Sequence, residues 1–482
     1  MRLRRLIVVL AAGTVVAGCS TAPAPSTALP QDLAGRITVD AMFTHLRKFQ
    51  EIADANGDNR GQGSPGYDAS IDYVSQLLRD AGFDVQTPEF ERLGEMRGGD
   101  PGLVIAGRSH PVDQASLLIT TPRGGLSALS LRPAKAPGCT AADYGTVKVA
   151  GAISVVDDTG CSVVVKQNTA TAQGAVGLLV VRGSTTQPSP AGLFTPGYFR
   201  QLTVPVGVID KATDAALRRT SAPVRLTFDG KSELVKSRNL VAQTKTGSST
   251  DVVMVGAHLD SAGRGPGIND NGTGVAAVLE TALQLGASPQ VPNAVRFAFW
   301  GAGETGLQGA NQYVGGLQPD ELDDLALYLN FDLLGSPNPG YFTYDGDQSA
   351  APTDAKPVPE GSAGIERTLA GYLNLAGVRP ADMPLSTTTD YSPFLTAGVP
   401  VGGTTTGSSQ RKTEVQARLW GGRAGTAFDP NYHTPRDTID NVDVYALSKM
   451  GPAVAFAVGT YAVSLDGVNG VPPRPERERH HG

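Results

Sequence analysis

The chain has 482 residues, of which 18% are charged and 40% hydrophobic, and it contains 59 glycines. This composition is typical of a globular, loop-rich protein of two or three domains and excludes a disordered chain. The formal net charge of −6 gives no reason to expect nucleic acid as a partner.

The first nineteen residues have the pattern of an export signal. A basic start, Met1-Arg-Leu-Arg-Arg5, precedes an apolar run that is too short to span a bilayer comfortably. The run ends in Val16-Ala-Gly-Cys19, which resembles the lipobox of bacterial lipoproteins and implies that Cys19 carries lipid. An ordinary signal peptide with an incidental cysteine is the alternative. We expect a signal peptide over residues 1–18 and a flexible tether over residues 19–35.

Residues 36–97 have the pattern of the start of an α/β domain. Apolar residues recur at helical spacing over residues 41–53 and 67–81, and a β-type run follows over residues 83–90. His45 lies off the apolar face of the first helix, so we expect it at the surface and not at a metal.

Residues 98–236 are predicted to form a β-rich insertion. Short β-type runs alternate with Gly, Pro and Ser, and charged residues are sparse. Cys139 and Cys161 in an exported segment favour one disulfide over a metal site. The order of these cysteines and of the runs Val147-Lys-Val-Ala-Gly-Ala-Ile-Ser-Val-Val and Gly174-Ala-Val-Gly-Leu-Leu-Val-Val resembles a protease-associated (PA) domain.

The α/β pattern resumes at residue 237, and residues that could bind a metal follow its strands. A buried strand over residues 251–256 leads into His258-Leu-Asp260, and Asp270 lies in a Gly- and Asn-rich turn before a helical run. In α/β proteins, sites are built in the crevice beyond the carboxyl ends of the strands. An imidazole and carboxylates placed there suit zinc or a similar divalent ion.

Three further residues have comparable positions. Glu304 follows a strand over residues 294–300, Asp332 follows a strand over residues 325–331, and His433 lies in a polar loop. Each of them taken singly has a structural explanation, such as a helix cap or a loop residue. Their joint occurrence with His258 and Asp270, at three strand ends and two loops, favours a metal site.

The order of these motifs is similar to that of exported bacterial di-zinc aminopeptidases of the leucyl-aminopeptidase type. The motifs are His258-Leu-Asp-Ser, Gly267-Ile-Asn-Asp-Asn-Gly, Trp300-Gly-Ala-x-Glu-x-Gly-Leu, Leu329-Asn-Phe-Asp and Tyr432-His433. The resemblance implies a phosphorylase/hydrolase-like α/β fold, in which a mixed sheet is flanked by helices. The peptidase domain would comprise residues 36–97 and 237–465, followed by a polar tail over residues 466–482.

The same resemblance assigns roles to residues of this chain. It implies two zinc ions, bridged by Asp270 and held by two pairs, His258 with Asp332 and Glu304 with His433. Asp260 would orient the imidazole of His258. Tyr432 would donate a hydrogen bond to the oxyanion that develops when a peptide carbonyl is attacked.

One position departs from the family pattern. The family has two adjacent glutamates after Gly-Ala, of which the first is the general base and the second a ligand, and here Gly303 stands in the base position. A glycine cannot move a proton, so we expect weak aminopeptidase turnover. The substitution Gly303→Glu is expected to raise that turnover.

The leading interpretation is a monomeric zinc aminopeptidase that removes N-terminal residues from peptides. A lipid on Cys19 would anchor it in the cell membrane, on the extracytoplasmic face. Two alternatives stay open: a catalytically impaired relative that binds peptides, and a related di-zinc carboxypeptidase or deacylase.

Overall fold

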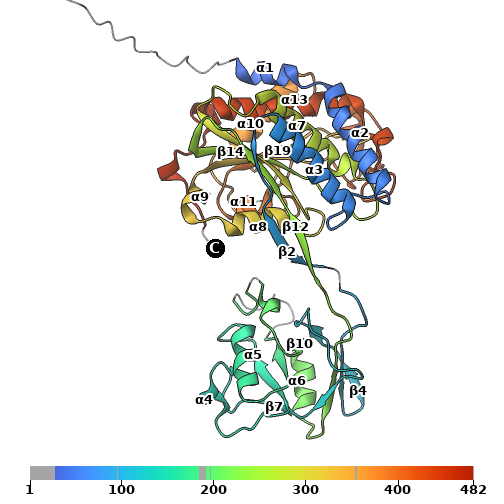
Figure 1. Ribbon diagram of the computed structural model, residues 1–482, viewed down its shortest axis with the longest axis vertical. Helices are drawn as coiled ribbons and strands as arrows, with labels where there is room; N and C mark the ends of the chain where they lie inside the picture. The colour runs from blue at the N-terminus through green and yellow to red at the C-terminus, as the bar shows by residue number, and fades with distance from the viewer. Residues whose placement is uncertain (1–27, 95, 184–191, 196, 353–354, 481–482) are drawn as a thin grey trace, which may run out of the picture. The chain divides into compact units, whose positions relative to one another are not determined.

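The computed structural model describes residues 28–94, 96–183, 192–195, 197–352 and 355–480. Within these ranges the chain forms two compact units (Figure 1). The large unit contains residues 28–90 and 237–480, and the inserted unit is Glu91–Lys236. The sequence pattern places the start of the insertion at residue 98. The expected signal peptide and Cys19 lie outside the described residues.

An eight-stranded mixed sheet forms the centre of the large unit. Its strand order is β1-β13-β15-β14-β16-β19-β17-β18, with β15, β14, β16 and β19 mutually parallel. Strand β13 is antiparallel to both of its neighbours, whereas β17 is antiparallel to β19 and parallel to β18. The strands are β1 Asp84–Gln86, β13 Leu240–Gln243, β14 Ser248–His258, β15 Asn293–Trp300, β16 Leu325–Phe331, β17 Phe342–Tyr344, β18 Ala381–Met383 and β19 Val401–Thr405.

Helices cover both faces of this sheet (Figure 1), which confirms the predicted mixed sheet flanked by helices. One face carries α1 Leu29–Arg36, α2 Val39–Ala55, α3 Pro65–Asp80, α7 Gly274–Leu285, α10 Ser362–Leu375 and α13 Val444–Val463. The other face carries α8 Gln308–Gly316, α9 Pro319–Asp323 and α11 Ser392–Thr396. Shorter segments are η2 Ile268–Thr273, α12 Glu414–Trp420, η3 Ile439–Asn441, η4 Gly467–Asn469 and η5 Arg474–Glu476.

The central strands β14, β15 and β16 are rich in apolar residues, and both of their faces are buried. In β15, Val295, Phe297 and Phe299 pack on the side of α7, whereas Ala298 and Trp300 pack on the side of α8. Successive side chains of a strand point to opposite faces, and a parallel sheet covered on both sides therefore has continuous hydrophobic runs. The apolar runs therefore end where the strands leave the two hydrophobic layers. The polar residues of the candidate site lie at or just after these strand ends.

The predicted strand over residues 83–90 is divided between two sheets. Its first part is β1, and its last residues belong to β2 (Glu89–Leu93), which pairs with β12 (Leu234–Arg238) in a separate two-stranded sheet. Pro88 lies between the two parts, and a proline has no N–H to donate to a ladder.

The expectation that His45 lies at the surface is wrong. Its side chain is buried because α2 packs against both α3 and α7. The ring lies 2.8 Å from the hydroxyl of Tyr73 through Nδ1 and 3.2 Å from a carboxylate oxygen of Glu280 through Nε2. A buried imidazole needs such partners.

Both ends of the described chain are packed into the large unit. The expected tether over residues 19–35 includes most of α1, whose Leu33 is fully buried and whose turns pack on α13. In the predicted polar tail, Arg477 is buried and donates to the backbone carbonyls of Thr250 and Asp323. Among the helices of the described ranges, none combines the length and the apolarity that a membrane crossing requires.

The inserted unit contains two sheets. The five-stranded sheet has the order β5-β10-β9-β8-β7 and the four-stranded sheet the order β4-β3-β11-β6. Cys139 and Cys161 form a disulfide with an S–S distance of 2.05 Å. The elements are β3 Gly102–Ile105, β4 Arg108–His110, β5 Asp113–Gln114, β6 Leu126–Ala128, β7 Ser130–Leu131, α4 Ala141–Tyr144, β8 Ile153–Asp157, α5 Val163–Ala172, β9 Gly177–Val181, η1 Tyr198–Arg200, β10 Val206–Ile209, α6 Lys211–Leu217 and β11 Val224–Thr227.

We expect Leu33→Ala to lower the free energy of unfolding of the large unit by about 2–5 kcal/mol, because it leaves a cavity under α1. Urea denaturation followed by circular dichroism measures this loss. The matched control is Leu375→Ala, since Leu375 is 88% exposed and its truncation should change the stability by less than about 0.5 kcal/mol. Equal stability of the two variants would show that α1 is not part of the folded unit.

Candidate metal centre

The five residues proposed as metal ligands meet at one edge of the large sheet. His258 is the last residue of β14, Asp332 directly follows β16, and Glu304 lies in the loop after β15. Asp270 lies in η2, and His433 comes from the loop between α12 and η3. Because β14, β15 and β16 are parallel, their carboxyl ends share an edge, and the two loops close over it.

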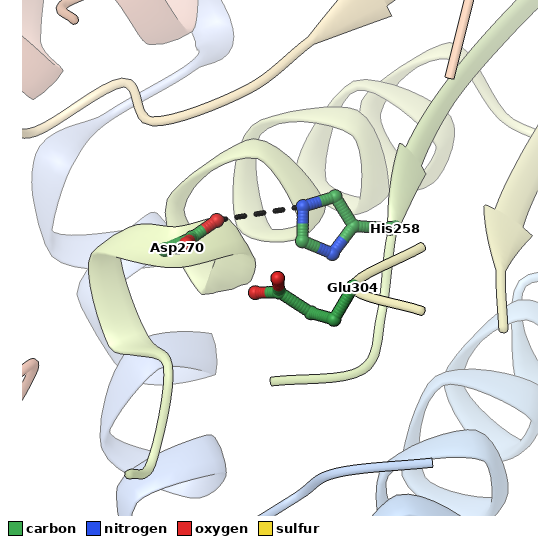
Figure 2. A group of neighbouring side chains, drawn as sticks. All are labelled: His258, Asp270 and Glu304. Atoms are coloured by element: carbon green, nitrogen blue, oxygen red, sulfur yellow. Dashed lines mark ion pairs between the residues drawn. The ribbon is translucent and has the colours of Figure 1, made fainter. Parts of the chain in front are cut away.

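Asp270 lies between the two histidines. Its Oδ1 atom is 3.4 Å from Nε2 of His258, and its Oδ2 atom is 3.2 Å from Nε2 of His433. Nε2 of His258 is also 3.5 Å from Oδ1 of Asp332, and Nε2 of His433 is 2.9 Å from Oε2 of Glu304. In Figure 2, the side chains of His258, Asp270 and Glu304 point toward one another. The structure thus separates the five residues into two sets that share Asp270.

These separations fit ions held between the side chains. A tetrahedral zinc ion with ligands at about 2.0–2.1 Å holds its ligand atoms about 3.3 Å apart. Three carboxylate oxygens, Asp270 Oδ2, Glu304 Oε1 and Asp332 Oδ1, are buried and make no hydrogen bond among the described residues, although two of them face imidazole nitrogens. Buried acceptors without a hydrogen bond are costly, and a bound cation would satisfy all three.

The ionisable side chains of the site shift the pKa values of one another. Burial by itself lowers the pKa of His258, but the carboxylates of Asp270 and Asp332 outweigh it and hold that pKa well above its usual value. Contacts with Asp270 and Glu304 raise the pKa of His433 to about 10. Burial, together with the charge of Asp270, raises the pKa of Glu304 to about 8. Without an ion the site therefore holds protons, which a divalent ion displaces when it binds.

Asp260 supports the site chiefly through the backbone. Its carboxylate accepts hydrogen bonds from the N–H groups of Gly303 (2.9 Å) and Glu304 (3.3 Å). The hydrogen bond of His258 Nδ1 goes to the backbone carbonyl of Asp260 at 3.1 Å, while the carboxylate lies 3.8 Å from the same nitrogen. The segment His258–Asp260 therefore orients the imidazole, and the carboxylate additionally fixes the loop that carries Glu304.

Gly303 packs tightly against His258. A Cβ atom at position 303 would lie 2.4 Å from Cβ and 2.7 Å from Cγ of His258, which is closer than side-chain atoms can approach. A side chain at this position therefore requires His258 or the loop that carries Gly303 to shift. On this backbone we predict that Gly303→Glu disturbs a proposed ligand, in contrast to the gain in turnover that the family pattern by itself predicts.

Three residues at the site have left-handed backbone conformations. They are Ala302 (φ 56°), Leu333 (φ 54°) and His433 (φ 57°). L-residues other than Asn and Asp adopt this region rarely, and such strain is concentrated at functional sites. Here it occurs in the loop before Glu304, directly after Asp332 and at His433 itself.

Two buried carboxylates near the ligands are given no role by the sequence patterns. Asp437 accepts hydrogen bonds from the backbone N–H groups of Asn269 (2.7 Å) and Asp270 (3.0 Å), and burial raises its pKa to about 8. Asp390 is buried beside the site, and burial raises its pKa to about 7. Neither follows a strand, so spacing provides no signal for them.

Tyr432, the proposed oxyanion donor, stacks on the ring of His433 with 3.8 Å between ring centroids. Burial and the charge of Asp270 raise its pKa well above the usual value, so the hydroxyl keeps its proton and can donate. The side chain of His433 is 41% exposed, which places this end of the site at the surface.

Comparison with known proteins identifies the family of the chain. The sequence matches Peptidase family M28 over residues 239–458 and the PA domain over residues 127–217. It is 49% identical over 455 residues to the probable lipoprotein aminopeptidase LpqL of Mycobacterium tuberculosis, which covers 93% of this chain and 90% of that protein. An aminopeptidase of Pseudomonas aeruginosa is 37% identical over 450 residues, with 90% and 83% covered.

Solved structures show the same fold. A zinc aminopeptidase from Bacillus subtilis has a TM-score of 0.51 at 22% identity, over 90% of this chain and 97% of that one. The aminopeptidase from Aneurinibacillus sp. strain AM-1 has a TM-score of 0.52 at 21% identity, over 92% and 98%. Because the relatives that are 49% and 37% identical match most of its length, the chain belongs to peptidase family M28 and is a metallo-aminopeptidase with an inserted PA domain.

Proposed function

We propose that this protein is a di-zinc aminopeptidase that removes N-terminal residues from peptides and is held at the outer face of the cytoplasmic membrane by a lipid on Cys19. The observation that carries the proposal is the division of five ligand residues into two sets around Asp270. His258 contacts one oxygen of that carboxylate and also Asp332. His433 contacts the other oxygen and also Glu304.

The side chains of the site would bind the zinc ions and orient the substrate. Two bound zinc ions would supply Lewis-acid activation of a water molecule and of the peptide carbonyl. Asp260 holds the backbone of Glu304 in place, and the hydroxyl of Tyr432 is the available donor for an oxyanion at this site. The exposure of His433 supports access for a chain end.

Turnover is proposed to be slow. A positioned general base typically contributes about 10²–10⁴-fold to the rate, and position 303 provides none. The close approach of Gly303 to His258 also means that the missing carboxylate could not be accommodated without moving the ligand. We infer a kcat below that of relatives with a glutamate at this position.

The alternatives gain no specific support. The curated relatives are named aminopeptidases, which disfavours the carboxypeptidase or deacylase alternative. A catalytically impaired relative that binds peptides would keep the same ligand residues, and measured turnover separates it from an aminopeptidase. The lipoprotein description of the mycobacterial relative supports the anchor at Cys19.

The proposal predicts two zinc ions per chain, measured by elemental analysis of the purified protein. Asp270→Asn should reduce the content below one ion and abolish hydrolysis of aminoacyl anilides, because both ions lose their shared ligand. The matched control is Glu280→Gln. Glu280 is also a buried carboxylate of the large unit, and it lies 3.2 Å from Nε2 of His45 and accepts a hydrogen bond from Gln284 at 2.7 Å. One ion or none in the wild-type protein would contradict the di-zinc proposal.

Substitution of Gly303 tests the close contact with His258. Gly303→Ala should lower zinc affinity at least tenfold and lower kcat with it, because the added methyl group displaces the imidazole. Gly315→Ala is the control, since a Cβ there meets nothing within 4 Å. Unchanged zinc affinity in Gly303→Ala, or a higher kcat in Gly303→Glu, would show that the loop moves freely and that the packing argument fails.

The anchor is tested by cell fractionation. The wild-type protein should partition with membranes and carry lipid on its N-terminal cysteine, whereas Cys19→Ala should be released into the soluble fraction. Cys139→Ala serves as a control for the loss of a cysteine elsewhere. Membrane partitioning that survives Cys19→Ala would argue against lipidation.

A further inference from the structure

We propose that Arg60 is a positioning residue for the metal centre: its buried guanidinium fixes the loop that joins His258 to Asp270, and through this loop it sets the spacing of the two ligands. The inference rests on the proposed function, since it takes these two residues to hold zinc. Arg60 itself contacts none of the ligand side chains through a hydrogen bond.

The guanidinium of Arg60 binds both ends of this loop. Nη1 donates to the carbonyl of Leu259, Nε to that of Pro266 and Nη2 to that of Gly267, each at 2.8 Å. Leu259 directly follows His258, and Gly267 precedes Asp270 by three positions. The two ends of the loop are thus held to one rigid, planar group.

The backbone of Arg60 reinforces this contact. Its N–H donates to Oγ of Ser261 at 3.0 Å, and its carbonyl accepts from the N–H of Ser261 at 3.3 Å. Ser261 in turn donates to the carbonyl of Gly265 at 2.8 Å. The ring of Phe49 lies 4.8 Å below the guanidinium carbon. The side chain therefore has little freedom to move relative to the loop.

The positive charge of Arg60 is buried without an ion-pair partner among the described residues. The side chain is 0% exposed, and among the described residues no carboxylate lies within ion-pair distance of it. Burial lowers its pKa to about 10, against the opposing influence of Asp437, Asp260 and Asp270, so it stays protonated at neutral pH. Only a guanidinium offers three coplanar donors for three separate carbonyls, which explains why arginine is required.

Loss of the guanidinium would leave three buried carbonyl oxygens without donors. The loop would then rearrange to reach water, and the separation of His258 from Asp270 would no longer be fixed. Residues that orient metal ligands typically contribute 10–100-fold to metal affinity when removed. We expect a loss of this size for zinc.

Arg477 provides a matched control in the same unit. It is also a buried arginine that donates to backbone carbonyls, those of Thr250, Asp323 and Pro472. Its contacts lie at the opposite end of β14 from His258. Replacement of Arg477 should therefore lower stability without affecting the metal centre.

The experiment compares Arg60→Met, Arg60→Lys and Arg477→Met in the full chain. Zinc affinity is measured by competition with a chromophoric chelator, and stability by urea denaturation of the metal-free protein. Kinetics at saturating zinc give kcat and KM separately. We expect Arg60→Met to weaken zinc binding 10–100-fold and to lower kcat more than KM changes. Arg60→Lys should lie between it and the wild type, and Arg477→Met should bind zinc as the wild type does.

The outcomes separate the two proposals. Equal zinc affinities of Arg60→Met and Arg477→Met, at comparable stability, would overturn the positioning role while the di-zinc proposal stands. If Arg60→Met does not fold, Arg60→Lys decides: wild-type zinc affinity and kcat in that variant would overturn the inference. A wild-type protein that binds no zinc would overturn the proposed function and the inference with it.

Discussion

The two oxygens of one carboxylate, that of Asp270, face different imidazoles, and the large unit is built to hold that carboxylate in place. His258 comes from a strand that is rigid because both of its faces are buried, whereas His433 comes from a loop that crosses the sheet edge. Asp437 fixes the backbone of Asp270 from the same loop region. The hydrophobic layers on both sides of the sheet therefore supply rigidity, and the polar loops supply the chemistry.

The part of this arrangement that follows the strands could be predicted from the sequence. His258, Glu304 and Asp332 lie at or shortly after the ends of apolar runs, and parallel strands bring such positions to one edge. His433 lies in a loop without periodicity, so only its joint occurrence with the other four residues and the Tyr432-His433 motif indicate that it is a ligand. The supporting residues Arg60 and Asp437 could not be found in this way. Their importance comes from contacts with backbone groups distant in sequence, which no local pattern encodes.

The same limit explains the other differences between expectation and structure. Apolar spacing predicts the helix α2, but it cannot show that α3 and α7 both pack against α2 and bury His45. The composition of the segment before residue 36 indicates a tether, whereas its last part is a helix with Pro30, Leu33 and Ala34 buried. Gly303 shows the limit most clearly. Its residue type indicates that the general base is missing, whereas the structure shows that its backbone packs closely against the side chain of His258.

The packing of α1 on α13 also determines how far the protein can extend from a membrane. Ten positions separate Cys19 from Leu29, the first residue of α1, and a fully extended chain covers at most about 3.3–3.6 Å per residue. With a lipid on Cys19, the start of α1 could lie no more than about 35 Å from the bilayer surface. Such a tether would keep the enzyme beside the membrane, and peptides at a distance from the cell would be out of reach.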